Sequence, residues 1–372
     1  MVERVTDSDL TILGGGLGGV SLASRLTTTG ADFRLFEAKS RLGGRIYSLP
    51  STDDNLCVDL GPTWFWPHQA RICRLVDSLG LATFDQFVDG DVLYELSRGE
   101  LERSQGTAGM QSRRIEGGTQ ALIRRLSESF RDDALLLSHR VIELTREEQN
   151  WCITFEHGDG VGCHYSPHLC LAIPPRVLVD TINVAQWLSP QLAAALTRTP
   201  TWMAAQAKFV ATYRDAFWRD QGLAGDAFSR VGPMVEIHDA SAAEDAGHAL
   251  FGFIGVPATA RSQLGRETLE KRCLQQLSAL FGTRALAPER SYFYDWAFDD
   301  AIATSGDREE LAPAHPSLDL TEFRDELDAL CLSFAVSEAS TQDAGYLEGA
   351  LSAAEQAFSQ FAARATADGG LN

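Results

Sequence analysis

The stretch "LTILGGGLGGV" (residues 10–20) places five glycines directly behind four residues that are typical of a buried strand. The residues that follow predict a helix, because Val20, Ala23 and Leu26 recur at helical spacing and Gly30 supplies a stop. "FRLFEA" (residues 33–38) then predicts a second strand. A strand, a glycine turn, a helix and a second strand together predict a βαβ unit.

Three of these glycines match the G-x-G-x-x-G pattern of dinucleotide-binding turns. Gly14 allows a sharp turn, Gly16 lets the backbone approach a pyrophosphate, and Gly19 lets helix and strand pack closely. The start of the helix presents free N–H groups to the phosphates. Glu37 ends the second strand 23 residues after Gly14, where its carboxylate can accept hydrogen bonds from a ribose diol. The unit therefore predicts a dinucleotide site.

The same residues narrow the choice of dinucleotide. A carboxylate at Glu37 would repel a 2′-phosphate, which disfavours NADP but does not separate NAD from FAD. A second glycine turn follows in "RLGGR" (residues 41–45), with Gly43, Gly44 and Arg45. This turn favours FAD, whose pyrophosphate and ribityl chain continue past the first unit, and Arg45 can present a planar positive fork to the diphosphate. A surface loop with a solvated arginine is the alternative interpretation.

Beyond this point the chain resembles the flavin-containing amine oxidases, the relatives of monoamine and polyamine oxidases, as a short member of bacterial type. The resemblance starts in "GGGLGGVSLASRL" and "FEAKSRLGGRIYS" and continues in "VDLGPTWFWPHQARICRLVDSLGL" (58–81) and "RRIEGGTQALIRRL" (113–126). It extends through "AKFVATYRDAFW" (207–218) to "SFAVSEASTQDAGYLEGALSAAEQA" (333–357).

The resemblance implies an α/β fold, with a doubly wound, Rossmann-like FAD-binding domain and an inserted α+β substrate domain. The expected FAD-binding domain is discontinuous, with residues 1–72, 112–185 and 318–372. Residues 73–111 and 186–317 form the expected substrate domain.

Local patterns agree with this alternation of elements. Strand-like runs occupy residues 135–175, and helical periodicity occurs over 67–81, 120–130, 267–281 and 344–362. The acidic, alanine-rich segment "HDASAAEDAGH" (238–248) predicts an exposed loop.

Three residues match catalytic positions of the resembled family. Lys208 lies in "QAKFVATY", where alternation predicts a strand, and the matching family lysine holds a water against the flavin N5 edge. A buried ammonium shifts its pKa readily, which suits that role. Tyr346 matches an aromatic wall of the substrate cleft, and Trp296 matches a tryptophan near the flavin. A solvated strand-edge lysine and a packed core tyrosine are the structural alternatives.

Other positions match cofactor contacts. The segment that begins with Gly61, Pro62, Thr63 and Trp64 matches the family chain beside the isoalloxazine. The backbone of Val141 matches a contact with the adenine.

Glu338 matches an acidic residue near the ribityl chain and the phosphates. Val336 and Ser337 precede it where glycine and a small polar residue are common, so this contact is expected to differ.

The chain also departs from the family pattern. Members that hold FAD covalently use a cysteine about nine residues beyond the tryptophan, but "AIATSGD" (301–307) has none. We therefore expect noncovalent FAD. The same region lacks the second wall of the aromatic cage, so Tyr346 stands alone or Trp64 or Trp66 substitutes for the missing wall. The chain is shorter than typical members, and the loss falls in the substrate domain.

Composition disfavours nucleic-acid-binding and membrane-spanning proteins. A formal charge of −19 disfavours nucleic acid as a partner, and no apolar run is long enough for a membrane span. Seven scattered cysteines suit a reducing compartment, so we expect a cytoplasmic protein. We expect no metal, although "CHYSPHLC" (163–170) contains a metal-like arrangement of cysteines and histidines.

The expected function is oxidation of an amine C–N bond by hydride transfer to flavin N5, with release of an imine. The expected partners are a small-molecule amine, molecular oxygen or another electron acceptor, and a second copy of the chain in a homodimer. Two alternatives stay open. One is a related FAD enzyme that oxidises a C–C or C–H bond, of the desaturase or porphyrinogen oxidase type. The other is a flavin-binding protein without turnover.

Overall fold

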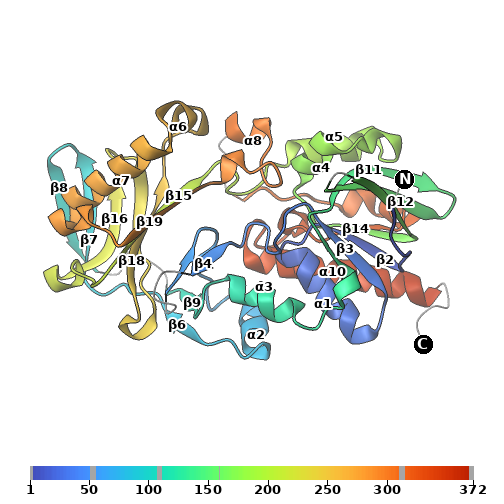
Figure 1. The fold of residues 1–372 in the computed structure, drawn as a ribbon, viewed down its shortest axis with the longest axis horizontal. Helices are drawn as coiled ribbons and strands as arrows, with labels where there is room; N and C mark the ends of the chain where they lie inside the picture. Colours follow the sequence, from blue (N-terminus) through green and yellow to red (C-terminus); the bar gives the residue numbers. More distant parts are fainter. Residues whose placement is uncertain (1–2, 51–55, 107–110, 159, 310–314, 368–372) are drawn as a thin grey trace.

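A computed structural model of the chain describes residues 3–50, 56–106, 111–158, 160–309 and 315–367. Two large sheets lie at opposite ends of the molecule, and both termini lie at the end that holds the parallel sheet (Figure 1). Within the described residues, none of the helices combines the length and the apolar character that crossing a membrane requires.

The first sheet is parallel and holds the predicted βαβ unit. Its strand order is β10-β3-β2-β14-β20, and the strands are β2 (Leu10–Leu13), β3 (Phe33–Glu37), β10 (Leu135–Leu137), β14 (His168–Leu171) and β20 (Leu332–Phe334). Strands β2, β3, β14 and β20 are buried on both faces, as a parallel sheet requires, and the edge strand β10 is partly buried. The expected Rossmann-like arrangement is confirmed.

Helices cover one face of this sheet. They are α1 (Leu17–Thr29), α2 (Ala70–Ser78), α3 (Gln120–Ser127) and α10 (Leu347–Ala367). Helix α1 ends at Gly30, which takes the left-handed conformation (φ +74°) as the sequence predicts. A Cβ on Gly18 would lie 1.8 Å from the Ala335 carbonyl oxygen, so only glycine lets α1 pack this closely against the residue that follows β20.

The other face of the parallel sheet is covered by a four-stranded sheet and by short helices. The sheet has the order β1-β13-β12-β11, with β1 (Glu3–Arg4), β11 (Arg140–Glu147), β12 (Asn150–His157) and β13 (Gly160–Ser166). The helices are α4 (Pro175–Thr181), α5 (Pro190–Arg198) and α9 (Arg324–Ala329).

A seven-stranded sheet forms the second end of the molecule. Its order is β19-β15-β18-β17-β16-β7-β8, with β7 (Asp91–Ser97), β8 (Glu100–Gln105), β15 (Ala207–Tyr213), β16 (Leu223–Ser229), β17 (Met234–Asp239), β18 (His248–Ile254) and β19 (Arg290–Asp295). Helix α7 (Arg266–Phe281) packs on one face, and α6 (Ala258–Leu264) precedes it.

Shorter elements connect the two ends. They are β4 (Ser48–Pro50), β5 (Cys57–Asp59), β6 (Thr83–Asp85), β9 (Arg113–Ile115), α8 (Ser305–Glu309), η6 (Trp296–Phe298) and η8 (Ser337–Ala339).

Packing suggests different domain limits from those expected. The expected boundary after residue 72 divides helix α2, whereas Ile72 and Val76 share one core with α1 and α10. Likewise, Leu192 and Leu196 of α5 pack in the second core of the parallel sheet rather than with residues 199–317. We therefore propose that the cofactor-side unit comprises the described residues within 1–81, 112–198 and 318–372.

The segment 238–248 is not the exposed loop that its composition predicts. It includes the end of β17 and the start of β18, and Asp239 is fully buried. The Asp239 carboxylate accepts hydrogen bonds from Trp218 Nε1 (2.9 Å) and Arg219 Nε (3.0 Å). These partners stabilise a buried carboxylate, although the local composition predicts that it lies at the surface.

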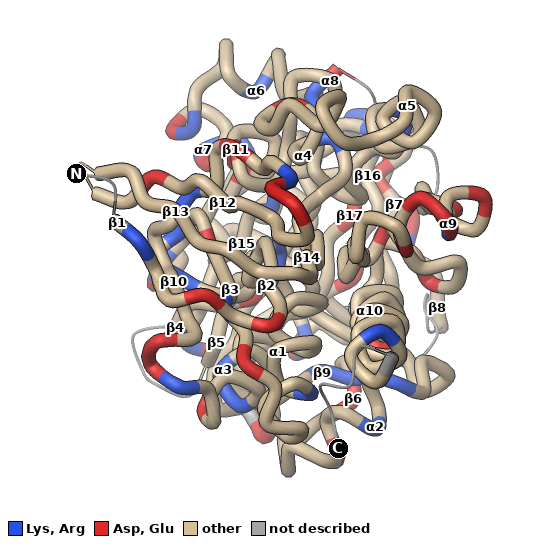
Figure 2. The backbone as a smooth tube through the Cα atoms, turned by 90° about the vertical axis from the view of Figure 1, so that its right-hand side faces the viewer, with Lys and Arg blue, Asp and Glu red and all other residues tan. Residues whose placement is uncertain are grey.

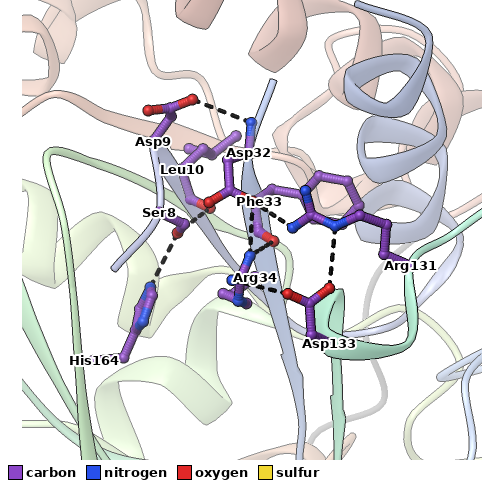
Figure 3. A network of polar contacts seen from close by, with 9 residues as sticks. All are labelled: Ser8, Asp9, Leu10, Asp32, Phe33, Arg34, Arg131, Asp133 and His164. Atoms are coloured by element: carbon purple, nitrogen blue, oxygen red, sulfur yellow. Dashed lines mark hydrogen bonds and ion pairs between the residues drawn. The ribbon is translucent and has the colours of Figure 1, made fainter. Parts of the chain in front are cut away.

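The beginning of β3 is held by a polar network around buried Arg34 (Figure 3). Arg34 donates to Asp32 (2.8 Å) and Asp133 (3.2 Å). His164 lies beside Ser8, with 3.0 Å between Nε2 and Oγ, and burial together with Arg34 lowers the pKa of His164 to about 4. The network thus fixes the end of β3 that is opposite the glycine turn.

The "CHYSPHLC" histidines lie in separate cores. His164 of β13 packs against Phe36, whereas His168 of β14 packs edge-on against Phe361. Among the described residues no group of three metal-ligating side chains is found. In the view of Figure 2, basic residues are interspersed with acidic ones over the described chain and form no continuous basic stripe.

Candidate active site

A cavity of about 490 Å³ lies where the glycine turns of the parallel sheet meet the seven-stranded sheet. Most of the residues predicted for the site line it: Gly14, Gly16, Glu37, Gly43, Gly44, Arg45, Gly61, Pro62, Thr63, Trp64, Val141, Lys208, Trp296 and Tyr346. Gly19 and Glu338 lie behind this lining. One cavity therefore brings together residues from segments that are far apart in the chain.

The two glycine turns interlock at the cavity. Gly14 (φ +104°) and Gly43 (φ +118°) take conformations that favour glycine, and Gly43 N–H donates to the Gly15 carbonyl (2.7 Å). A Cβ on Gly19 would lie 2.1 Å from the Gly14 carbonyl oxygen. A Cβ on Gly16 would meet no atom within 4 Å, because Gly16 faces open space at the start of α1.

Glu37 braces the first turn as well as lining the cavity. Its carboxylate accepts from Gly15 N–H (2.7 Å) and from Lys39 N–H (2.8 Å), and the side chain is buried. Each carboxylate oxygen keeps a lone pair that can accept from a ribose hydroxyl. Sequence reasoning missed the bracing contact, since it requires the chain to fold back from Glu37 onto the turn.

The guanidinium of Arg45 is paired with a carboxylate at the cavity wall. Its guanidinium forms two hydrogen bonds with the carboxylate of Glu338, of 2.7 and 2.8 Å. Glu338 also accepts from Trp202 N–H (3.0 Å). Arg45 is therefore held at the cavity wall by an acidic residue behind it, which orients its remaining N–H groups.

The cavity fits a diphosphate of the kind that FAD carries. Ser337 lines it, and the buried Ser337 Oγ has no hydrogen-bond partner within the described part of the chain. The first N–H groups of α1 have no partner inside the helix, and the space beside Gly16 leaves room for phosphate oxygens to approach them. These donors and the Arg45 guanidinium suit an anionic ligand.

Lys208 lies at the middle of the cavity wall on β15. Its Nζ donates to the Gly61 carbonyl (3.1 Å) and to Thr63 Oγ1, and it lies 4.0 Å from the centroid of the Phe251 ring. Burial lowers the pKa of Lys208 to about 7, with Arg114 acting in the same direction and Asp59 opposing it. The solvated strand-edge alternative is therefore wrong, because Lys208 is buried.

The structure identifies which tryptophan accompanies Tyr346. Trp66 packs perpendicular to Tyr346, with ring centroids 5.5 Å apart. Trp64 instead packs against Phe251 (5.5 Å) and His238 (5.0 Å). Trp66 and Tyr346 together line the cavity, so Tyr346 does not stand alone.

His315 supports Tyr346 from behind and had no signal in the sequence. The Tyr346 hydroxyl lies 2.9 Å from His315 Nε2, and the rings stack at 4.3 Å. His315 Nδ1 donates to the Ala344 carbonyl (3.1 Å), and in the neutral ring this leaves Nε2 to accept from the tyrosine. Burial raises the pKa of Tyr346, which keeps its hydroxyl protonated.

Trp296 also lines the cavity and is held in place by a hydrogen bond. Its Nε1 donates to the Leu60 carbonyl (2.9 Å), and its ring lies 4.5 Å from that of Tyr294. Trp296 therefore lies beside the segment that begins with Gly61.

An acidic group in the cavity was missed by the sequence. Glu236 of β17 lines the cavity, and its carboxylate lies 2.7 Å from His238 Nε2. Burial alone would lower the pKa of His238, but its hydrogen bonds to Asp226 and Glu236 raise it to about 9. The strand pairing places Lys208 opposite Phe253, and Phe253 opposite Glu236. The three side chains therefore lie in one row across neighbouring strands.

The chain is similar to known proteins. Residues 17–108 and 91–357 match the family model described as flavin containing amine oxidoreductase. Putrescine oxidase of Kocuria rosea is 33% identical over 92 residues, which are 25% of this chain and only 19% of that protein. A probable flavin-containing monoamine oxidase A of Dictyostelium discoideum is 20% identical over 380 residues, covering 75% of this chain and 82% of its own.

Solved structures show the same fold. Cyclohexylamine oxidase from Brevibacterium oxydans superposes with a TM-score of 0.80 at 20% identity, covering 97% of this chain and 100% of that chain. A putative protoporphyrinogen oxidase from Exiguobacterium superposes with a TM-score of 0.71 at 15% identity, covering 98% and 99%. Because the family model matches most of the residues, the chain belongs to the family of flavin-containing amine oxidoreductases.

Proposed function

We propose that the protein is an FAD-dependent oxidoreductase that oxidises the C–N bond of an amine and releases an imine. The observation that carries the proposal is the placement of Lys208. A buried lysine with a pKa of about 7 lies on the wall of the cavity that the dinucleotide-type turns and two aromatic rings also line.

FAD is the cofactor that these residues would hold, and we propose that it is held noncovalently. The glycine turns, Ser337 and Arg45 would bind the diphosphate, and Glu37 would bind the ribose. All seven cysteines belong to the described residues and are free, and the cavity lining includes none of them. When bound, FAD accepts a hydride at N5 from the substrate carbon.

The chain's own residues would prepare the amine. An amine gives up hydride only when its nitrogen is neutral, and the rings of Trp66 and Tyr346 disfavour a charged ammonium. Lys208 would hold a water at the cavity and exchange a proton with it, since a pKa near 7 makes both protonation states accessible. Molecular oxygen or another acceptor would then take the electrons.

Glu236 favours amines that carry a second positive charge. It lies two strands from Lys208, about 10 Å at the usual strand spacing, and its carboxylate lies 2.7 Å from His238 Nε2. Two similar proteins support the same substrate class: the putrescine oxidase of Kocuria rosea, and a putrescine oxidase that was solved with putrescine bound. We also place the protein in the cytoplasm, because its seven cysteines are unpaired.

The test is anaerobic mixing of the purified holoprotein with matched amines of one or two amino groups, followed by flavin bleaching and peroxide formation in air. We expect bleaching by at least one amine class and a preference for diamines. Glu236→Gln should weaken diamine binding about tenfold and leave monoamine binding nearly unchanged. Flavin that stays oxidised with every amine class contradicts amine oxidation. Equal oxidation of monoamines and diamines contradicts only the role of Glu236.

A further inference from the structure

Residues 299–302 follow η6 and cross from the seven-stranded sheet to the cofactor edge of the parallel sheet. They lead into α8, which lies over the middle of the molecule between the two sheets (Figure 1). Ala301 and Ile302 line the cavity. Ile302 is buried and packs in one cluster with Trp296, which anchors this end of the segment.

Two consecutive acidic residues attach the segment to the far side of the cavity. Asp299 forms an ion pair with Lys39, just beyond the end of β3, and accepts from the Tyr294 hydroxyl (2.7 Å). Asp300 forms an ion pair with Arg140 at the start of β11 (3.2 Å). The Asp299 carboxylate is nearly buried, whereas Asp300 is exposed.

The attachment points mark one end of the cavity. Lys39 and Arg140 both line it, next to Glu37 and Val141. Glu37 ends the strand beside the first glycine turn, where a dinucleotide places its adenosine ribose. Residues 299–302 therefore run from the Trp296 side of the cavity to its adenosine end, where both ion pairs lie.

We propose that residues 299–302 form a strap that encloses the adenosine half of FAD, so that cofactor release requires both ion pairs to open. The proposal rests on FAD binding at this cavity. Because one of the pairs is exposed, salt should weaken the strap. Neither pair includes a residue with an expected role in amine oxidation, so the strap would control cofactor retention and not chemistry.

The test measures how fast FAD leaves the holoprotein, as the flavin absorbance that stays with the protein through timed gel filtration. The variants are Asp299→Asn, Asp300→Asn and the double variant. Asp215→Asn is the matched control, because Asp215 forms an exposed ion pair with Arg284 away from the cavity. The double variant should release FAD about tenfold faster at low salt, and Asp300→Asn about twofold to threefold faster. The control should release FAD at the native rate.

The salt dependence of FAD release provides a second measurement, which does not require the substitution of a buried residue. Raising the salt concentration from about 20 mM to about 500 mM should speed release from the native protein more than from the double variant. Release within twofold of native in every variant, or equal salt dependence in native and double variant, would overturn the strap. If Asp299→Asn does not fold, Asp300→Asn and the native salt dependence decide the question. A native protein that binds no FAD would instead contradict the flavoprotein proposal.

Discussion

Glu338 and Arg45 are 293 positions apart in the chain, yet two hydrogen bonds of 2.7 and 2.8 Å join their side chains. Glu338 is fully buried, and Arg45 lines the cavity. The pair connects η8, near the end of the chain, to the second glycine turn near its beginning. A cofactor bound along the first turn would therefore lie against a wall that both ends of the chain assemble.

Glu338→Gln tests this pair. The substitution removes the negative charge that pairs with the Arg45 guanidinium. We therefore expect a loss of about 3 kcal/mol in the free energy of unfolding. We also expect weaker FAD binding, because Arg45 loses its orientation. Denaturant unfolding and FAD titration measure the two effects. Asp328→Asn is the control, since Asp328 forms an exposed ion pair with Arg364 and should lose less than about 1 kcal/mol. Equal losses in the two variants would refute the role of Glu338.

Gly16→Ala should weaken FAD binding without impairing folding. Gly16 has φ −72°, which alanine adopts freely, and the added Cβ would meet no protein atom within 4 Å. We expect unfolding temperatures near native without FAD and FAD affinity lowered at least about tenfold, because the methyl group would occupy space for the diphosphate. Gly160→Ala at the exposed start of β13 is the control for adding a methyl group. Unchanged FAD affinity in Gly16→Ala would place the diphosphate elsewhere.

Lys208→Met should slow turnover without loosening the protein. Methionine keeps the length of the buried side chain but cannot hold a water or exchange a proton. We expect flavin reduction or reoxidation to slow by about 100-fold or more, with the absorbance of bound flavin retained. Stopped-flow measurement of the two half-reactions shows which one depends on Lys208. Unchanged rates in both would favour C–C or C–H oxidation over amine oxidation.

The pKa of Lys208 also predicts a pH dependence of stability. The folded pKa of about 7 lies below the ordinary value of 10.5, so between these pH values the unfolded chain binds more protons than the folded one. The free energy of unfolding therefore rises with pH across this window, by up to about 4 kcal/mol from this group. Unfolding of native protein and Lys208→Met at pH 7 and pH 10 measures the difference. Parallel pH curves would show that Lys208 titrates normally.

The glycine turns, Glu37 and helix α1 were predictable from the sequence because their constraints are local. Backbone angles of Gly14 and Gly43, and the 23 residues from Gly14 to Glu37, are set within one βαβ unit and its next turn. Lys208 and Tyr346 could be predicted as site residues only through the family resemblance. The sequence of a single strand or turn does not show which other segments pack against it.

Tertiary structure alone decided how the cavity is completed. Glu236 reaches the cavity through the pairing of β17 with β18, His315 reaches Tyr346 through a loop contact, and Asp299 reaches Lys39 over 260 positions. Such contacts depend on how two sheets and their connections pack, and no pattern within a short window encodes that packing. The sequence thus determined the cofactor turns and their order, whereas burial and long-range pairing determined the charge and the walls of the substrate cavity.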